Sequence, residues 1–506
     1  MKILLISPPK SKEGFHTLRD EICFQDVIYV PFPIRLGTVA GILKNDHDVQ
    51  VIDANAMDYS YADLEREMPA ADMLIIESAS GLIFHDLETF RVAKKKFGES
   101  IKTVLIENIV APAFPERLMT DFPEIDFIVR GQPEIVFYDW SKRWDSPEQV
   151  NGLVFRKDGN VQVNPPASLP DNLDEYPYMH YEAFPMDRYS ISYLAAPMYE
   201  KVIPGIRFRS TRDCPYACPF CIIQPSEARG YDRRSFQMTP KRLVDEIEHV
   251  IQRYSLKGIF FWDETFTVNQ KRAMAICEEI IQRRVKFTWR CLTRIDTLNK
   301  PLLEKMYEAG CRHIEFGLES GDQAVRTLLQ KKFPDEKAVE VVRWTRKAGI
   351  SANCDFIVGM PWETDETLKK TIDLATKLMA DNIHITMGFP YPDTEFHRVA
   401  QQDGLLLIDD FYPIMINERV RVGAKPWVRS RALSSEALWE GWKKVRSTVN
   451  RHYLMHQVLT NPSTWWRYMK LCTNWDDISR LSVRGVRSLQ KAISHQQPSP
   501  SPYEGI

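Results

Sequence analysis

Strand-like and helical segments alternate along the first part of the chain, and this pattern limits the folds that it can adopt. Short β-branched runs such as KILLIS, VQVIDAN, MLIIESAS, TVLIEN and DFIVRG are separated by segments with helical periodicity. The alternation predicts an α/β domain over residues 1–150, with a doubly wound, parallel, Rossmann-like sheet. Ligands of such sheets bind beyond the carboxyl ends of the strands, where the loops follow Ser7, Asp53, Ser78, Glu107 and Arg130. No G-x-G-x-x-G motif follows the first strand, which argues against a dinucleotide ligand.

A second alternation begins at about Gly205. Six strand-like segments, from IRFRS to NIHITMGFPYP, are each followed by a loop or helix. Such a series predicts an incomplete parallel (β/α) barrel over residues 191–400, with its chemistry at the carboxyl ends of the strands. Between the two series, residues 151–190 contain a DG turn flanked by short strands and several prolines, which predicts a hairpin and an extended linker.

The last part of the chain is predicted to be helical over residues 401–495, with a disordered tail over residues 496–506. Lys and Arg outnumber Asp and Glu in this helical part and are interleaved with Trp and Tyr. One interpretation is a helical cap whose aromatic side chains pack on the barrel and whose charges are solvated. The other is a basic, aromatic surface for an anionic substrate or for peripheral contact with a membrane.

Composition adds few constraints. The formal net charge is −2, which indicates no charged partner, and nucleic acid is not expected. The first apolar run, MKILLIS, is too short for a signal peptide, and no run approaches the roughly 20 residues that span a bilayer. We therefore expect a cytoplasmic, reducing location, in which isolated cysteines are small buried residues.

Three cysteines are clustered, in RSTRDCPYACPFC. Cys214, Cys218 and Cys221 have the spacing C-x3-C-x2-C. A structural zinc usually takes four protein ligands, and no second C-x2-C or H-x3-H lies nearby. Three thiolates on one loop can instead bind three irons of a 4Fe-4S cluster and leave the fourth iron for another ligand.

A three-cysteine loop that opens an incomplete barrel resembles the radical S-adenosylmethionine (SAM) superfamily. The resemblance implies that Cys214, Cys218 and Cys221 bind the cluster and that SAM occupies its fourth iron. It also implies SAM contacts in FFWDETF, TRID, EFGLESG and DFIVGMPWET, at successive strand ends. The implied contacts are Phe220, Asp263, Glu264, Arg294, Glu319, Ser320, Ile357 and Gly359. The last motif departs from the family pattern, because Asp355 and Trp362 replace two of its glycines.

The N-terminal domain resembles the cobalamin-binding domain of one group within this superfamily, in which VIDAN and RGQPE also recur. The resemblance implies cobalamin between the two domains, with Asp53 and Ser78 among its contacts. The D-x-H-x-x-G motif of other cobalamin proteins is absent, as is usual in this group. A G-G-P-H loop of the family is replaced by residues 107–110, ENIV. We interpret His85 as a polar loop residue rather than a cobalt ligand.

The resemblance implies a cobalamin-dependent C-methyltransferase that modifies an unactivated carbon of a lipid or natural-product precursor. Reduced ferredoxin or flavodoxin would supply the electron that cleaves SAM to a 5′-deoxyadenosyl radical, so no catalytic base is nominated. An alternative keeps the radical but forms a ring, adds oxygen or couples carbons without methyl transfer. A non-catalytic protein that binds membranes or nucleic acid is an alternative of another class.

Overall fold

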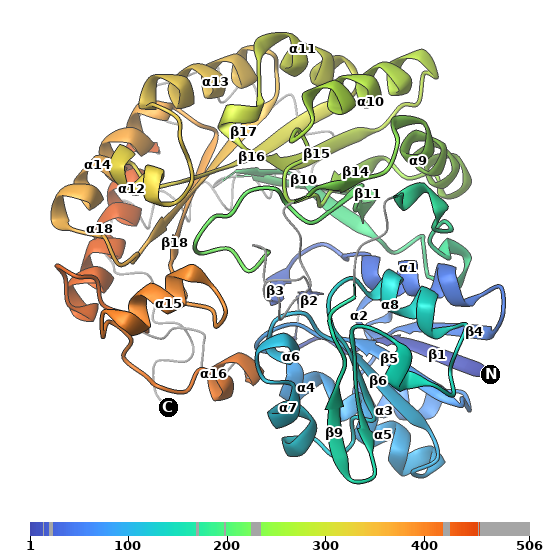
Figure 1. The fold of residues 1–506 in the computed structure, drawn as a ribbon. Coiled ribbons are helices and arrows are strands. Elements are labelled where there is room, and N and C mark those ends of the chain that lie inside the picture. The colour runs from blue at the N-terminus through green and yellow to red at the C-terminus, as the bar shows by residue number, and fades with distance from the viewer. Residues whose placement is uncertain are drawn as a thin grey trace.

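The computed structural model describes residues 1–13, 15–19, 24–167, 172–196, 199–223, 234–417, 426–453 and 455. Two sheets organise this part of the chain, one in each of the predicted α/β domains (Figure 1). None of the helices in these ranges is long and apolar enough to cross a membrane. Most of the predicted basic C-terminal region lies outside the described residues.

The N-terminal sheet has the strand order β4-β1-β5-β6-β7-β8-β9. Its first five strands are parallel, which confirms the predicted doubly wound sheet. Its strands are β1 (Lys2–Ser7), β4 (Asp48–Asp53), β5 (Met73–Glu77), β6 (Lys102–Ile106), β7 (Phe127–Val129), β8 (Leu153–Lys157) and β9 (Asn160–Val163). The chain passes from β1 to β4 on one side and then to β5 on the other. The carboxyl ends of β1 and β5 therefore form the switch point at which such sheets bind ligands.

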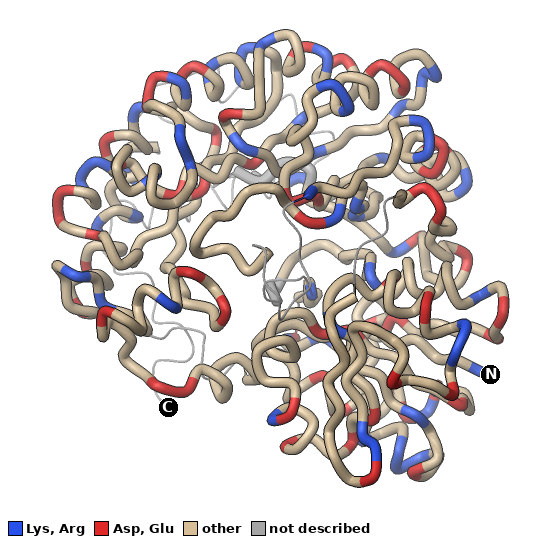
Figure 2. The backbone as a smooth tube through the Cα atoms, in the orientation of Figure 1, with Lys and Arg blue, Asp and Glu red and all other residues tan. Residues whose placement is uncertain are grey.

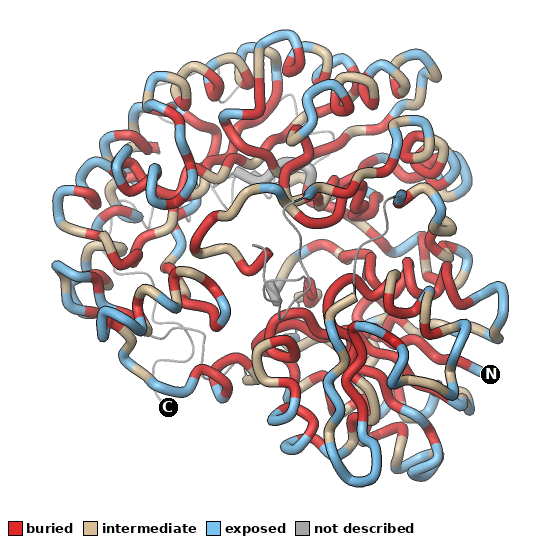
Figure 3. Tube along the Cα trace, viewed as in Figure 1, coloured by how far each residue is buried: buried red, intermediate tan, exposed pale blue. Residues whose placement is uncertain are grey.

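Helices cover both faces of this sheet (Figure 1). The pair α1 and α8 packs together on one face, and α3 packs against α5 on the other. The helices are α1 (Ile34–Leu43), α2 (Ala54–Met57), α3 (Tyr61–Glu67), α4 (Ile83–Asp86), α5 (Glu88–Phe97), α6 (Val110–Ala113), α7 (Pro115–Asp121) and α8 (Pro133–Trp140), with the 3-10 turn η1 (Pro147–Gln149). The central strands β1, β5 and β6 are mostly apolar and buried, as expected when helices cover both faces (Figure 3). The edge strands β4 and β9 are mostly exposed or half-buried.

Two hairpins modify the predicted arrangement. The hairpin expected in the linker, β8–β9, pairs antiparallel with β7 and so forms the edge of the N-terminal sheet. This pairing satisfies the backbone groups of β7 that an edge would expose. A second hairpin, β2 (His16–Arg19) and β3 (Phe24–Val27), lies between β1 and α1 and is not predicted from the sequence.

The second sheet has the order β10-β11-β14-β15-β16-β17-β18. The six strands from β11 to β18 are parallel, which confirms the incomplete barrel, and β10 adds an antiparallel edge. Its strands are β10 (Ser190–Ala196), β11 (Tyr199–Phe208), β14 (Gly258–Phe261), β15 (Thr288–Thr293), β16 (Cys311–Glu319), β17 (Ser351–Val358) and β18 (Asn382–Met387). The short pair β12 (Thr211–Arg212) and β13 (Phe236–Gln237) follows β11.

Amphipathic helices form the outer wall of the barrel (Figure 1). They are α9 (Pro240–Tyr254), α10 (Gln270–Gln282), α11 (Lys300–Glu308), α12 (Gln323–Leu328), α13 (Asp335–Lys347) and α14 (Asp365–Leu378). The remaining elements are α15 (Glu395–Gln402), α16 (Tyr412–Ile416), α18 (Ser435–His452), η2 (Leu173–Glu175), η3 (Tyr181–Ala183) and η4 (Ile295–Thr297). Side-chain caps fix several helix starts, such as Thr239 on α9 and Thr364 on α14. Helix α18 packs on α14 and β18 and extends the wall.

Candidate active site

The cysteine loop follows β11 and β12 at the mouth of the barrel. Cys218 is 9% exposed, Cys214 and Cys221 are half-buried, and all three are free thiols. Burial raises the pKa of each thiol, that of Cys214 to about 11. Thiolates in such a place are stable only beside a metal or a cation.

An iron-sulfur cluster fits this loop better than a single metal ion does. Within the described part of the chain, no three His, Cys, Asp or Glu side chains converge closely enough to hold one ion. A cluster sets a different requirement, because each cysteine binds a separate iron. Three free thiols on one short loop meet that requirement.

Two cations lie beside Cys218. Arg294 Nη1 donates to Cys218 Sγ at 3.7 Å, and the guanidinium lies 3.9 Å from the centre of the Tyr216 ring. Lys331 is buried, and its charge favours the thiolate form of Cys218. The structure therefore places the predicted residue Arg294 next to Cys218, a predicted cluster ligand, and adds Lys331, which sequence reasoning misses. Lys331 lies in the loop between α12 and α13 rather than at a strand end, so no strand-end pattern finds it.

Glu319 ends β16 in an unusual backbone conformation. Its φ is +70°, and the register of β16 against β17 shifts between Gly317 and Glu319. Glu319 Oε1 lies 3.0 Å from Lys331 Nζ, with side chains 8% and 7% exposed. Burial raises the pKa of Glu319 although the charge of Lys331 opposes it. Ser320 is buried beside it, and its Oγ accepts a hydrogen bond from Asp322 N. Strain of this kind gathers at functional sites.

Asp263 and Glu264 are engaged by the segment that precedes the cysteines. The Asp263 carboxylate accepts hydrogen bonds from Ser210 N at 2.6 Å, Ser210 Oγ at 2.6 Å and Thr211 N at 2.9 Å. Glu264 forms an ion pair with Arg209. In this structure the two carboxylates position the start of the cysteine loop, and their predicted contact with SAM stays a prediction.

Phe220, Ile357 and Trp362 pack around one apolar cluster near the fifth strand. Two of the predicted SAM contacts, Phe220 and Ile357, therefore pack on the same cluster. Gly359 has φ +101°, which favours glycine, and its N–H donates to Glu363 Oε2 at 3.2 Å. Burial raises the pKa of Glu363 to about 7.

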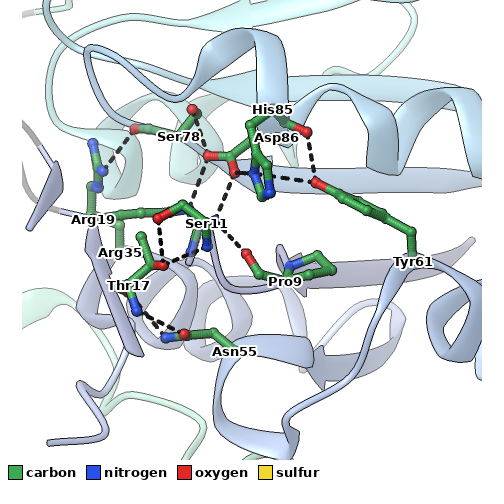
Figure 4. A network of polar contacts seen from close by, with 10 residues as sticks. All are labelled: Pro9, Ser11, Thr17, Arg19, Arg35, Asn55, Tyr61, Ser78, His85 and Asp86. Atoms are coloured by element: carbon green, nitrogen blue, oxygen red, sulfur yellow. Dashed lines mark hydrogen bonds and ion pairs between the residues drawn. The ribbon is translucent and has the colours of Figure 1, made fainter. Parts of the chain in front are cut away.

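The predicted rim residues of the N-terminal sheet, Asp53 and Ser78, form hydrogen bonds with other groups of the protein. Asp53 accepts hydrogen bonds from Ala56 N at 2.9 Å and from Tyr189 Oη at 2.7 Å, and burial raises its pKa to about 6. Ser78 Oγ donates to Asp86 Oδ2 at 2.7 Å (Figure 4). The predicted contact of Asp53 and Ser78 with cobalamin also stays a prediction.

Asp86 is the centre of a polar network at the switch point (Figure 4). Arg19 donates to Asp86 Oδ1 at 2.6 Å and to Oδ2 at 2.9 Å, and the two side chains are 1% and 0% exposed. His85 Nδ1 lies 3.0 Å from Asp86 Oδ1, and Tyr61 Oη donates to His85 O at 2.6 Å. Arg19 comes from β2, so the ion pair fixes the unpredicted hairpin to the rim.

Comparisons with known proteins agree with this arrangement. Residues 208–375 match the family model of the Radical SAM superfamily. The chain is 28% identical to an uncharacterized methyltransferase of Pyrococcus horikoshii, over 91% of this chain and 94% of that protein. It is 27% identical to the anaerobic magnesium-protoporphyrin IX monomethyl ester cyclase of Rubrivivax gelatinosus, over 72% of this chain and 66% of that protein.

A solved structure shares the fold of both domains. It is the radical SAM methyltransferase TsrM of Kitasatospora setae with cobalamin and a 4Fe-4S cluster bound, with TM-score 0.65 and 16% identity. The match covers 89% of this chain and 88% of that chain. The part of the chain that matches the Radical SAM superfamily of enzymes, residues 208–375, carries the three-cysteine loop at the mouth of the barrel.

Proposed function

We propose that the protein is a cobalamin-dependent radical SAM methyltransferase that modifies an unactivated carbon of a small-molecule substrate. The observation that carries the proposal is the group of three free thiols on one loop, with Arg294 and Lys331 beside Cys218. This group lies at the barrel mouth, next to the ligand-binding rim of the N-terminal sheet.

Each part of the barrel mouth has a role in binding SAM. Arg294 and Lys331 are the cations available for the SAM carboxylate, and both are held by neighbouring groups. Arg294 pairs with Asp296 at 2.7 Å and Lys331 pairs with Glu319 at 3.0 Å. The apolar cluster around Phe220 offers a surface for adenine. A reduced 4Fe-4S cluster held by Cys214, Cys218 and Cys221 would supply the electron that cleaves SAM to methionine and a 5′-deoxyadenosyl radical, while the protein would position the reactants and exclude water.

The rim of the N-terminal sheet fits a ligand rich in amide groups, such as cobalamin. Asn108 follows β6 and is 1% exposed. Neither its Oδ1 nor its Nδ2 has a hydrogen-bond partner in the described part of the chain. Glu107 beside it accepts from Ile109 N at 3.0 Å and Ala111 N at 2.7 Å. Buried polar groups are normally paired, so an unpaired amide at a ligand-binding rim supports a ligand there.

One experiment separates methyl transfer from the alternative, which the similarity to a cyclase favours. The protein is purified without oxygen, reconstituted with iron, sulfide and cobalamin, and incubated with SAM that carries a deuterated methyl group. The products are analysed by mass spectrometry with cell extract as the source of substrate. A substrate that gains the labelled methyl supports methyl transfer. A modified substrate without the label contradicts it and supports ring formation or another radical reaction.

The cluster assignment has its own test. Cys218→Ala should abolish formation of 5′-deoxyadenosine from SAM and lower the iron content. Cys277→Ala is the matched control, because Cys277 is a buried free thiol in α10. Retained SAM cleavage in Cys218→Ala, or a wild-type protein without 4Fe-4S absorbance, would contradict the assignment.

We further propose that the substrate is a lipid or natural-product precursor and that ferredoxin or flavodoxin supplies the electron. Support for the substrate class comes from the basic, aromatic C-terminal sequence. In the described residues of α18, the rings of Trp439 and Trp442 stack at 4.9 Å, with Lys443 and Arg446 near them. Metabolite comparison of a deletion strain tests the substrate class. An accumulated polar metabolite of low mass would contradict it.

A further inference from the structure

A small cavity lies where the two domains meet and is lined mainly by arginines. Its volume is about 30 Å³. The arginines come from the hairpin and α1 of the N-terminal domain, and from β11 and the segment before the cysteines. They are Arg19, Arg35, Arg207, Arg209 and Arg212. Figure 2 shows basic and acidic residues side by side where the barrel faces the N-terminal domain.

Carboxylates pair with four of these arginines. The pairs are Arg19–Asp86, Arg35–Glu77, Arg209–Glu264 and Arg212–Glu134. Only two of those carboxylates, Glu77 and Glu134, line the cavity itself. Among the described residues that line the cavity, guanidinium groups therefore outnumber carboxylates.

In the described part of the chain, two of the guanidinium groups have a buried N–H₂ without an acceptor. Arg35 donates from Nε to Glu77 Oε2 at 3.3 Å and from Nη2 to Ser78 O at 3.2 Å. Arg19 uses Nε and Nη2 for Asp86. Among the described residues, neither Arg19 Nη1 nor Arg35 Nη1 has a hydrogen-bond partner. Buried donors of charged groups are costly to leave unpaired.

Ion pairs between the domains explain only part of this arrangement. Arg212 pairs with Glu134 of α8, and such pairs would hold the domains together without any ligand. They do not explain why, among the described residues, Arg19 Nη1 and Arg35 Nη1 have no partner although both arginines line the same cavity. The volume suffices for about two water molecules, and hence for two oxygen atoms of one anion. Arginine binds phosphate and carboxylate oxygens in this way.

We propose that this cavity binds an oxyanion of a ligand that lies between the two domains. One source is the phosphodiester of bound cobalamin, and that assignment rests on the proposed function. The other is a phosphate or carboxylate group of the substrate. Both sources offer oxygens to the same donors, Arg19 Nη1 and Arg35 Nη1.

The first arm of the test compares two corrinoids. Hydroxocobalamin carries the phosphodiester, whereas diaquacobinamide lacks it together with the base. Equilibrium dialysis gives the Kd of each for the wild type, Arg35→Gln and Arg66→Gln. Arg66 is the matched control, since its side chain is 64% exposed in the same domain. If cobalamin is the source, Arg35→Gln should weaken hydroxocobalamin binding by about tenfold or more and leave cobinamide within about threefold.

The second arm uses inorganic phosphate and needs no corrinoid. Phosphate should raise the Tm of the cobalamin-free wild type and of Arg66→Gln at constant ionic strength, but not that of Arg35→Gln. Loss of this stabilisation with unchanged corrinoid binding assigns the oxyanion to the substrate. Should Arg35→Gln fail to fold by circular dichroism, Arg35→Lys replaces it, with a smaller effect expected because the charge remains.

The outcomes decide between the proposals. If Arg35→Gln changes neither the preference for hydroxocobalamin over cobinamide nor the response to phosphate, the cavity proposal is overturned. If the wild type binds neither corrinoid, the cobalamin part of the proposed function fails, and the phosphate arm still decides the cavity.

Discussion

The ion pair between Arg19 and Asp86 holds the hairpin β2–β3 on the rim, so we expect Arg19→Met to release it. Burial alone would raise the pKa of Asp86. The charge and hydrogen bonds of Arg19, with a hydrogen bond from His85, outweigh burial and lower it. Breaking a buried pair costs about 3–5 kcal/mol. Protonation of Asp86 would not avoid this cost, because protonating an aspartate with the ordinary pKa of about 3.9 at pH 7.5 costs about 5 kcal/mol, at roughly 1.4 kcal/mol per pH unit.

Hydrogen exchange measures the loss of stability at the hairpin itself. The Thr17 amide donates to Asn55 Oδ1 at 2.9 Å, and Asn55 Nδ2 donates to Thr17 O at 3.0 Å, so amides of β2 report opening of the hairpin. A loss of 3–4 kcal/mol should make them exchange about a hundredfold to a thousandfold faster. Arg19→Met/Asp86→Asn should recover most of the protection, because no charge stays buried. The control Arg66→Gln should leave exchange unchanged.

The pH dependence has a definite sign. In Arg19→Met the unpaired Asp86 binds a proton more readily in the folded state than in the unfolded one. The loss of protection should therefore shrink as pH falls from 7.5 to 5.5. Protection within threefold of the wild type at pH 7.5 would refute the reasoning.

Three further predictions follow from single sites. Gly359→Ala should lower stability by about 1–3 kcal/mol, because the φ of +101° is strained for alanine and the new Cβ would lie 2.8 Å from Met387 Sδ; an unchanged Tm would contradict this. Because burial raises the pKa of Asp53 to about 6, the wild type should lose about 2 kcal/mol of stability as pH rises from 4 to 6, and Asp53→Asn should not; parallel Tm profiles would refute the assignment. Lys331→Met should weaken SAM binding by about tenfold or more at unchanged iron content, as measured by equilibrium dialysis of reconstituted protein, whereas an unchanged Kd would remove Lys331 from the site.

The sequence predicts the repeating parts of the fold well, because each strand and helix has its own periodicity. Both parallel sheets follow from alternation, and Arg294 is found beside Cys218 because strand ends gather at one rim. Hydrogen-bond and ion-pair partners that meet only in the tertiary structure are not predictable in this way. Asp263 bonds to backbone groups of the cysteine loop, and Lys331 reaches Glu319 from a loop. Neither contact has a local sequence signal.

The hairpin β2–β3 shows the same limit in the N-terminal domain. Its strands are short, and HTLRDEICFQDV has no glycine-containing turn that would mark a hairpin. It is stabilised on the rim by Arg19–Asp86 and Thr17–Asn55, contacts between residues 67 and 38 positions apart. A local pattern carries no information about such distant partners.

The contacts between the domains link the two candidate sites physically. Gln132, at the start of α8, accepts from Arg209 Nη1 at 3.3 Å and donates to Asp213 Oδ1 at 3.3 Å. Asp213 directly precedes Cys214, so α8 of the N-terminal domain fixes the backbone from which the cysteine loop begins. A ligand that contacts Arg209 from the arginine cavity would share this anchor. We therefore expect ligand binding in this cavity to affect the position of the cysteine loop through Arg209, Gln132 and Asp213.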